Sequence, residues 1–309
     1  MNYCISRWDT LEAKICRAEG MDPRHVECIV CERSKMVNTR NREPSEHVAT
    51  KIGGRVCVDF MEGIGNPDAN GGVKSMLIGV DENTDQTGVI AVKNSSQPHM
   101  LLEKLLEEMF RGEVRVKRLR LDNQFNTTGV QNWADEKEII LEFIVPYKHH
   151  QNGIPERRIR TLSDISHALL DTCDGKINLL PYAIVHAADV LNLWPTEEND
   201  EGRKICPLEK AQKRKQNRQD RPVFGCLAVV PVPPDQISAH TSPNARMRDR
   251  GAETIYLGRG SPFGKSGVLV WDIRTGKIRS VDKNGIKFPH VYFYLAIPIH
   301  IINFNALPP

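Results

Sequence analysis

The order of strand-like and helix-like segments in the middle of this chain constrains its fold more than any other feature. Short apolar runs predict strands, and longer runs with apolar residues on one side predict helices. The expected order is three strands, a helix, a strand, a short helix or turn, a strand and two helices, over residues 55–59, 75–81, 88–93, 98–110, 114–121, 129–138, 139–145, 153–173 and 178–193. Three consecutive strands can pair as a meander, whereas the last two strands need helical crossovers. The pattern therefore predicts an α/β fold.

The remaining segments differ in composition from this central part. Residues 197–222 are first acidic and then basic, which is typical of a charged linker. Beyond them, short apolar runs separated by Gly and Pro predict a small all-β module over residues 223–288, with strands at 226–232, 253–258, 268–273 and 277–282. Residues 1–45 are polar and weakly periodic, and the tail at 289–309 matches no pattern that we can assign.

Bulk composition sets wide bounds on function. The chain has 309 residues, of which 40% are hydrophobic and 26% charged, as in ordinary globular proteins. Its net charge of +3 permits a nucleic-acid partner without requiring one. Eight scattered cysteines do not form a disulfide framework, so a reducing compartment is expected. The N-terminus has no signal-peptide core, and the apolar run near 293–304 is short and contains Pro298 and His300, so we expect no membrane partner.

Three acidic residues stand where regular elements end or begin. Asp59 ends the first strand-like run, Asp122 ends the fourth, and Glu156 falls in the first turn of the helix expected at 153–173. Carboxylates gathered in this way can hold divalent metal ions for phosphoryl transfer on nucleic acid. The chain contains 39 acidic residues, so spacing alone also allows solvated strand ends and a helix-capping glutamate.

Several motifs resemble the integrase of copia-type LTR retrotransposons, a member of the DDE transposase and retroviral integrase group. The matching motifs are V-D-F at 58–60, K-R-L-R-L-D-N at 117–123, P-Y-x-x-x-Q-N-G-I-x-E-R at 146–157, F-G-C at 224–226 and Y-L-G at 256–258. The third motif is the specific one, and the resemblance covers about residues 24–288. It implies an RNase H-like catalytic core at 46–196, with a mixed five-stranded sheet and flanking helices, followed by the small β-rich module.

The resemblance also implies an activity and its site residues. Asp59, Asp122 and Glu156 would hold Mg²⁺ or Mn²⁺ while the 3′-hydroxyl of a cDNA end attacks a target-DNA phosphodiester. Residues near these acids would contact DNA: Asn123, Lys148, Gln151, Asn152, Arg157, Arg158 and Arg160. Arginine suits phosphate, although the arginines after Glu156 are equally compatible with solvated helix surface. The implied partners are LTR ends, target DNA and further copies of the chain, in the nucleus or a cytoplasmic particle.

Two cysteines near the N-terminus resemble half of a zinc module. Cys28 and Cys31 match the second half of the His-His-Cys-Cys module that precedes this core in relatives. A structural Zn²⁺ needs four nitrogen or sulfur ligands, and the upstream histidine pair is missing. Cys4 and Cys16 are candidate substitutes, and the alternative is a truncated module with free thiols. Such a truncation would fit a fragment of a Gag-Pol polyprotein.

The chain departs from the family pattern immediately after the second aspartate. The family usually has a glycine pair after D-N, where this sequence has Gln124 and Phe125. This departure favours an alternative, in which the chain is a catalytically dead remnant that only binds nucleic acid or a partner. A nuclease of the same RNase H-like fold is a further alternative, because the metal site would be shared.

Overall fold

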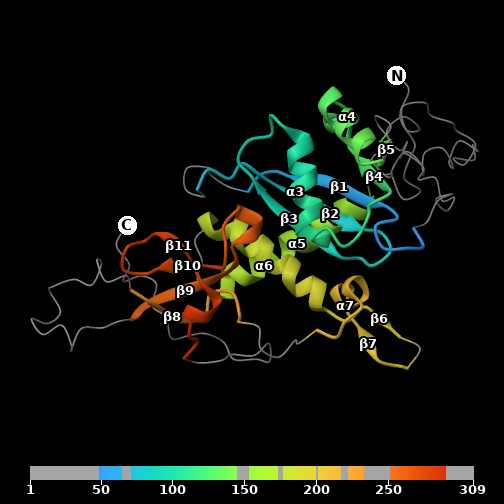
Figure 1. Cartoon of the computed structure of the whole chain (residues 1–309). Helices are drawn as coiled ribbons and strands as arrows, with labels where there is room; N and C mark the ends of the chain where they lie inside the picture. The colour runs from blue at the N-terminus through green and yellow to red at the C-terminus, as the bar shows by residue number, and fades with distance from the viewer. Residues whose placement is uncertain are drawn as a thin grey trace, which may run out of the picture. The chain divides into compact units, whose positions relative to one another are not determined.

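The computed structural model describes residues 49–64, 71–144, 153–172, 177–199, 201–216, 222–232 and 251–289 (Figure 1). Several residues named above lie outside this part: Cys28, Cys31, Lys148, Gln151 and Asn152. The segments at 1–45 and 290–309 lie outside it as well, so the proposed zinc half-module and the tail stay predictions.

The larger sheet has five strands in the order β3-β2-β1-β4-β5. Its strands are β1 (Val56–Met61), β2 (Ser75–Asp81), β3 (Thr87–Val92), β4 (Arg118–Leu121) and β5 (Ile140–Phe143). The first three form the expected antiparallel meander, whereas β4 pairs parallel with both β1 and β5. This mixed sheet with helical crossovers confirms the α/β prediction and has the strand order of an RNase H-like core.

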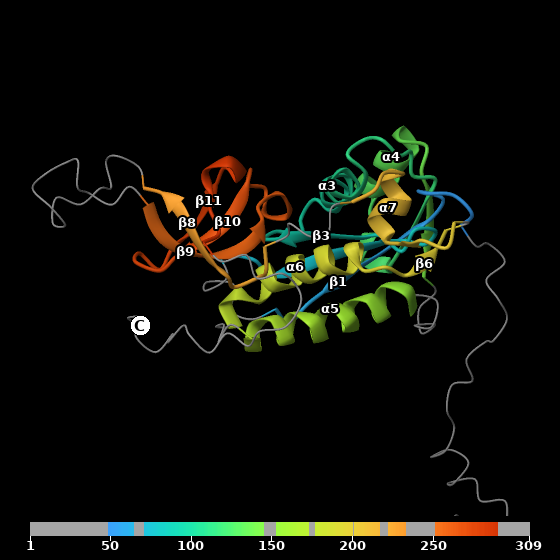
Figure 2. The same ribbon diagram turned by 90° about the horizontal axis from the view of Figure 1, so that it is seen from below.

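Helices cover both faces of this sheet (Figure 2). α3 (Pro98–Phe110) and α4 (Thr128–Glu136) lie on one face, while α5 (Gly153–Thr172) and α6 (Leu180–Leu193) lie on the other. Side chains alternate between the faces as β-pleating requires: Val56 and Val58 belong to the core under α3, whereas Met76 and Ile78 belong to the core under α5 and α6. Short 3₁₀ turns, η2 (Asn123–Phe125) and η4 (Ile177–Leu179), follow β4 and precede α6.

Glycines let α3 approach the sheet closely. A Cβ atom at Gly79 would come within 2.9 Å of Leu105, and one at Gly88 would fall on the Met109 side chain. The apolar side of α3 that the sequence predicts therefore packs directly on the backbone of β2 and β3. The helix ends at Phe110, and Arg111 adopts a left-handed conformation with φ 52°, followed by Gly112 with φ 72°.

The second sheet confirms the small all-β prediction. It is antiparallel, with the order β11-β10-β9-β8, and consists of β8 (Leu227–Pro231), β9 (Gly251–Arg259), β10 (Val268–Asp272) and β11 (Ile278–Val281). A 3₁₀ turn, η7 (Ser261–Phe263), joins β9 to β10, and another, η8 (Lys283–Gly285), follows β11.

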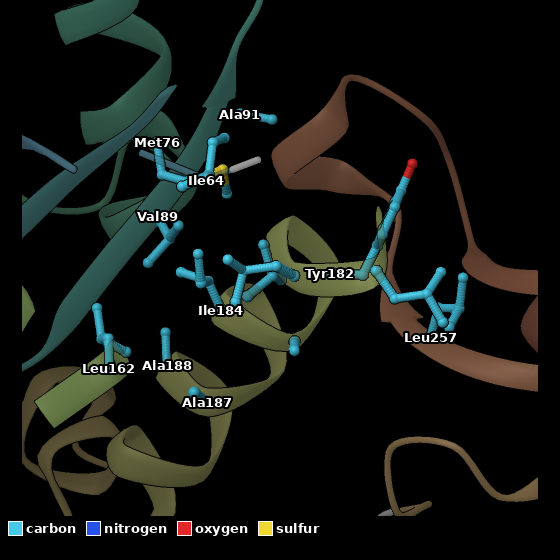
Figure 3. Close-up of a cluster of buried hydrophobic side chains, with 14 of the residues drawn as sticks. Ile64, Met76, Val89, Ala91, Leu162, Tyr182, Ile184, Ala187, Ala188 and Leu257 are labelled. Atoms are coloured by element: carbon cyan, nitrogen blue, oxygen red, sulfur yellow. The ribbon is translucent and has the colours of Figure 1, made fainter. Parts of the chain in front are cut away.

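The second sheet shares a hydrophobic core with α6. Leu257 and Leu269 belong to the same buried cluster as Ile184 and Ala188. Figure 3 shows Ile184 and Ala188 of α6 directed toward Val89 of the larger sheet, with Tyr182 on the side of Leu257. The Tyr182 and Phe263 rings stack with their centroids 4.6 Å apart. The β-rich module is therefore packed on the core rather than tethered beside it.

The segment expected to be a linker is structured over much of its length. It forms a two-stranded ribbon, β6 (Glu197–Glu198) and β7 (Lys204–Ile205), and a short helix, α7 (Pro207–Gln212). Pro207 occupies the first turn of this helix, and the buried Glu209 accepts from the Cys206 backbone N–H in a capping box. The proline and the capping box stabilise this helix, although the acidic and basic blocks of the segment led us to expect a linker.

No helix within the described ranges combines the length and the apolar character needed to cross a membrane.

Candidate metal and nucleic-acid site

Strand register places Asp59 opposite Asp122. β1 and β4 run parallel, with Val56 paired to Leu119 and Cys57 paired to Arg120. Continued for two residues, this register sets Asp59 against Asp122. Neighbouring strands are about 4.8 Å apart, and directly opposed residues point to the same face. Asp59 lies on the face that carries α5 and α6, because its neighbours Val58 and Phe60 belong to the opposite face. Asp122 follows Leu121, which also belongs to the opposite face, so the continued alternation sets Asp122 on the same face as Asp59.

Local hydrogen bonds fix the backbone around both aspartates. Oδ1 of Asp59 accepts the N–H of Phe60 at 2.8 Å, and Oδ1 of Asp122 accepts the N–H of Asn123 at 2.6 Å. Asp122 is exposed and caps η2. The Asn123 side chain donates through Nδ2 to the carbonyl of Ile144 at 3.0 Å, which ties the loop after β4 to the end of β5. Asn123 thus positions Asp122 through the backbone.

Phe125 anchors the loop that follows Asp122. Its side chain is fully buried and stacks on Phe60 with ring centroids 5.0 Å apart and planes at 5°. Phe60 directly follows Asp59 and Phe125 lies three residues after Asp122, so this ring pair connects the segments that follow the two aspartates on the opposite face of the sheet. Phe125 therefore contributes core packing beneath the two aspartates.

Glu156 lies in the first turn of α5, as expected, and is exposed. Arg158, two residues later, forms an ion pair with Asp85 in the β2–β3 turn. Since Asp81 pairs with Val56, this turn lies at the end of the sheet where β1 begins, whereas Asp59 lies three residues further along. Within the described ranges, no three His, Cys, Asp or Glu side chains form a group that could hold a metal ion. The role of Glu156 as a third ligand stays a prediction.

The arginines expected to bind nucleic acid occupy different environments. Arg157 and Arg160 are exposed on α5 and available to a ligand in solution. The Arg158 side chain is only 13% exposed and is held by Asp85. The Arg158 guanidinium therefore ties the start of α5 to the β2–β3 turn. Contact of Arg157, Arg158 or Arg160 with DNA stays a prediction.

A charged cluster beside the aspartates was missed from the sequence. It consists of Arg55, Arg118, Arg120, Glu82 and Glu142, on the same face as Asp59 and Asp122. In the register, Cys57, Arg120 and Glu142 form the row of residues next to the aspartate row. The alternation R-L-R-L at 118–121 was a signal, because it sets two arginines on the face opposite two buried leucines.

The interior of this region keeps Cys57 neutral. Burial raises the pKa of the Cys57 thiol to about 12, with smaller opposing contributions from Arg120 and Arg55. A thiol with this pKa is protonated near neutral pH and is therefore a poor nucleophile.

No protein-family model matches the chain, and no curated protein matches it. Fold, strand register and sequence motifs therefore carry the functional conclusion. Of these, the register of β1 and β4 is independent of the motifs, since it follows from backbone pairing.

Proposed function

We propose that this chain is a DNA strand transferase of the copia-type integrase kind. Its reaction is the attack of the 3′-hydroxyl of a cDNA end on a phosphodiester of target DNA. The observation that best supports the proposal is the parallel pairing of β1 with β4, whose register, extended by two residues, sets Asp122 at the end of β4 beside Asp59. Two carboxylates that lie side by side on the same face of a sheet can both bind one divalent ion.

The donor chemistry of the two aspartates fits Mg²⁺ or Mn²⁺. Both ions prefer hard oxygen ligands, and the strand spacing of about 4.8 Å lets two carboxylates reach one ion. Glu156, from the helix that packs on the same face, would supply the third carboxylate. A bound divalent ion would lower the pKa of the attacking hydroxyl and stabilise the departing oxygen.

The surrounding residues would hold the DNA and keep the aspartates in place. Asn123 fixes the backbone after Asp122, and the exposed Arg157 and Arg160 offer charges to DNA phosphates. By resemblance, the working form is a homo-oligomer that holds two cDNA ends in the nucleus. The second sheet, packed on α6, would provide additional DNA-binding surface.

A strand-joining assay tests the proposal. The full chain is incubated with an oligonucleotide that matches an LTR end, a plasmid target and Mn²⁺. We expect joined product from the wild type and at least a hundredfold less from Asp122→Asn, because the amide cannot replace an ionised ligand. Asp135→Asn, at an exposed site on α4, is the matched control and should join as the wild type does. Equal product from wild type and Asp122→Asn would refute the proposal.

A second candidate is a remnant that binds nucleic acid without catalysis. The observation that favours it is the lack of a three-carboxylate group within the described ranges. In the same assay, this candidate predicts DNA binding with no product from any variant. An RNase H-like nuclease would instead release cleaved fragments without joined ones, so the three functions give different products.

A further inference from the structure

Three arginines converge on two glutamates at the face shared with the aspartates. Nη1 of Arg55 donates to both oxygens of Glu82, at 3.2 and 3.0 Å. Arg118 donates through Nη1 to Oε1 of Glu142 at 3.2 Å, and Arg120 donates through Nε and Nη2 to Oε2 at 3.3 and 3.0 Å. We call these five residues the arginine cluster.

The arginine cluster carries one more positive than negative charge and has unused donors. Nε of Arg55 is buried and makes no hydrogen bond, although it lies 3.2 Å from Oε2 of Glu142. Among the described residues, Arg118 donates only to Glu142, and a guanidinium has five N–H donors. An anion with several oxygens would satisfy this excess of donors.

One side of the cluster is open to solvent in the described part of the chain. Arg118 is 36% exposed and Arg120 and Glu142 are each 21% exposed. Ile140, on the same face of the edge strand β5, is 52% exposed. An extended ligand could therefore reach the arginines along β4 and β5 without displacing core side chains.

The cluster lies one row from the aspartates. Same-face residues two apart along a strand are separated by about 6.7 Å, which is the step from Arg120 to Asp122. Asp59 and Asp122, which suit a metal ion, thus lie next to Arg120, which suits a phosphate. This order matches a polynucleotide backbone, in which the reacting phosphate has charged phosphates on either side.

We propose that Arg118 and Arg120 bind the DNA phosphate adjacent to the one that reacts at Asp59 and Asp122. This inference rests on the proposed function, since it places the reacting phosphate at the aspartates. In it, Glu142 holds the guanidinium planes in position and weakens the site enough for DNA to be released. In the arginine cluster, the Glu142 carboxylate thus competes with a DNA phosphate for the two arginines.

Binding measured without catalysis tests this site. Fluorescence anisotropy of a labelled LTR-end oligonucleotide in EDTA gives the affinity at several salt concentrations. We expect Arg118→Gln to weaken binding several-fold at low salt and to reduce the slope of log affinity against log salt by about 0.7–0.9, the loss of one phosphate contact. Arg115→Gln, at a 69% exposed arginine paired with Glu138, is the matched control and should retain the wild-type slope.

Glu142→Gln separates a phosphate site from a purely structural ion-pair network. Loss of the competing carboxylate should tighten DNA binding several-fold, and the thermal midpoint of this variant should rise more with added oligonucleotide than that of the wild type. A structural network predicts a lower midpoint with no gain in DNA affinity. Arg118→Lys, which keeps the charge, should retain the salt slope, and Arg120→Gln, which should reduce the slope as Arg118→Gln does, replaces Arg118→Gln if that variant fails to fold.

The outcomes distinguish this inference from the proposed function. Binding that depends on Arg118 without any joined product would support the phosphate site and refute strand transfer. Joined product together with wild-type salt slopes in Arg118→Gln and unchanged affinity in Glu142→Gln would refute the phosphate site alone.

Discussion

Among single side chains, the buried thiol of Cys226 gives a pH-dependent stability that can be measured. Burial raises the pKa of Cys226 from its usual value of 9.0 to about 12, against smaller opposing hydrogen bonds with the backbone. Above pH 9 the unfolded thiol loses its proton while the folded one keeps it. The stabilisation is therefore fully present below pH 9 and is lost as the pH rises toward 12, by about 1.4 kcal/mol per pH unit.

The Cys226→Ala variant isolates this contribution. Urea unfolding of wild type and variant at pH 8 and pH 10 should show that the stability difference between them shrinks by about 1 kcal/mol at the higher pH. All other titrating groups are the same in the two proteins, so their contributions cancel when the two free energies of unfolding are subtracted. A difference that stays constant between the two pH values would mean that the Cys226 thiol ionises normally in the folded chain.

The end of α3 predicts a stabilising substitution. Arg111 caps the helix in a left-handed conformation, with φ 52° and ψ 34°, and donates its backbone N–H to the carbonyl of Glu107 at 2.8 Å. A left-handed conformation is costly for any residue with a Cβ, and glycine adopts it freely. Arg111→Gly should therefore raise the free energy of unfolding by about 0.5–1 kcal/mol. Arg111→Ala keeps the Cβ and should bring no such gain; equal gains in both variants would assign the effect to the lost charge.

Local sequence signals predict most elements of this fold, and tertiary contacts explain where they fail. Short apolar runs predict β1, β2 and β3 to within two residues at either end, and the apolar side of α3 gives its bounds. The strand expected at 114–121 is shorter because Val116 turns into the core and Lys117 donates its N–H to Gly53 outside the sheet. Such long-range contacts cannot be predicted from a short stretch of sequence.

The candidate site could be predicted only in part for the same reason. Asp59 and Asp122 stand out because each ends a strand-like run, but their opposition depends on the pairing of β1 with β4. The arginine cluster depends on pairings among three strands, since Arg120 meets Glu142 only through the register of β4 and β5. The position of Glu156 relative to the aspartates depends on the packing of α5 on the sheet, through Ile154 and Ile159, which a local pattern does not encode.

Between the two sheets, Arg259 forms the main electrostatic link. It lies on β9 and pairs with Asp189 of α6 and with Glu108 of α3. Burial alone lowers the pKa of Arg259, but the two carboxylates outweigh burial and the pKa is raised. Removal of this guanidinium would leave two half-buried carboxylates without their cationic partner, which is destabilising by about 1–3 kcal/mol.

Hydrogen exchange can show whether this link couples the sheets. Arg259→Ala should speed amide exchange in β8, β9 and β10 while leaving β1 and β2 close to wild type, because the smaller sheet loses an anchor. Arg274→Ala, in the exposed β10–β11 turn, is the control and should leave both sheets unchanged. Equal acceleration in β1 and β9 would indicate one cooperative unit that the ion pairs stabilise as a whole.

Divalent-ion binding tests the pairing of Asp59 with Asp122 most directly, because it needs neither DNA nor turnover. Titration of Mn²⁺ into the full chain, followed by electron paramagnetic resonance of the free ion, counts bound ions and gives their affinity. The account predicts saturable binding by the wild type and by Asp135→Asn, and its loss in both Asp59→Asn and Asp122→Asn. Wild-type binding in both of these variants, or no binding by the wild type, would contradict the account.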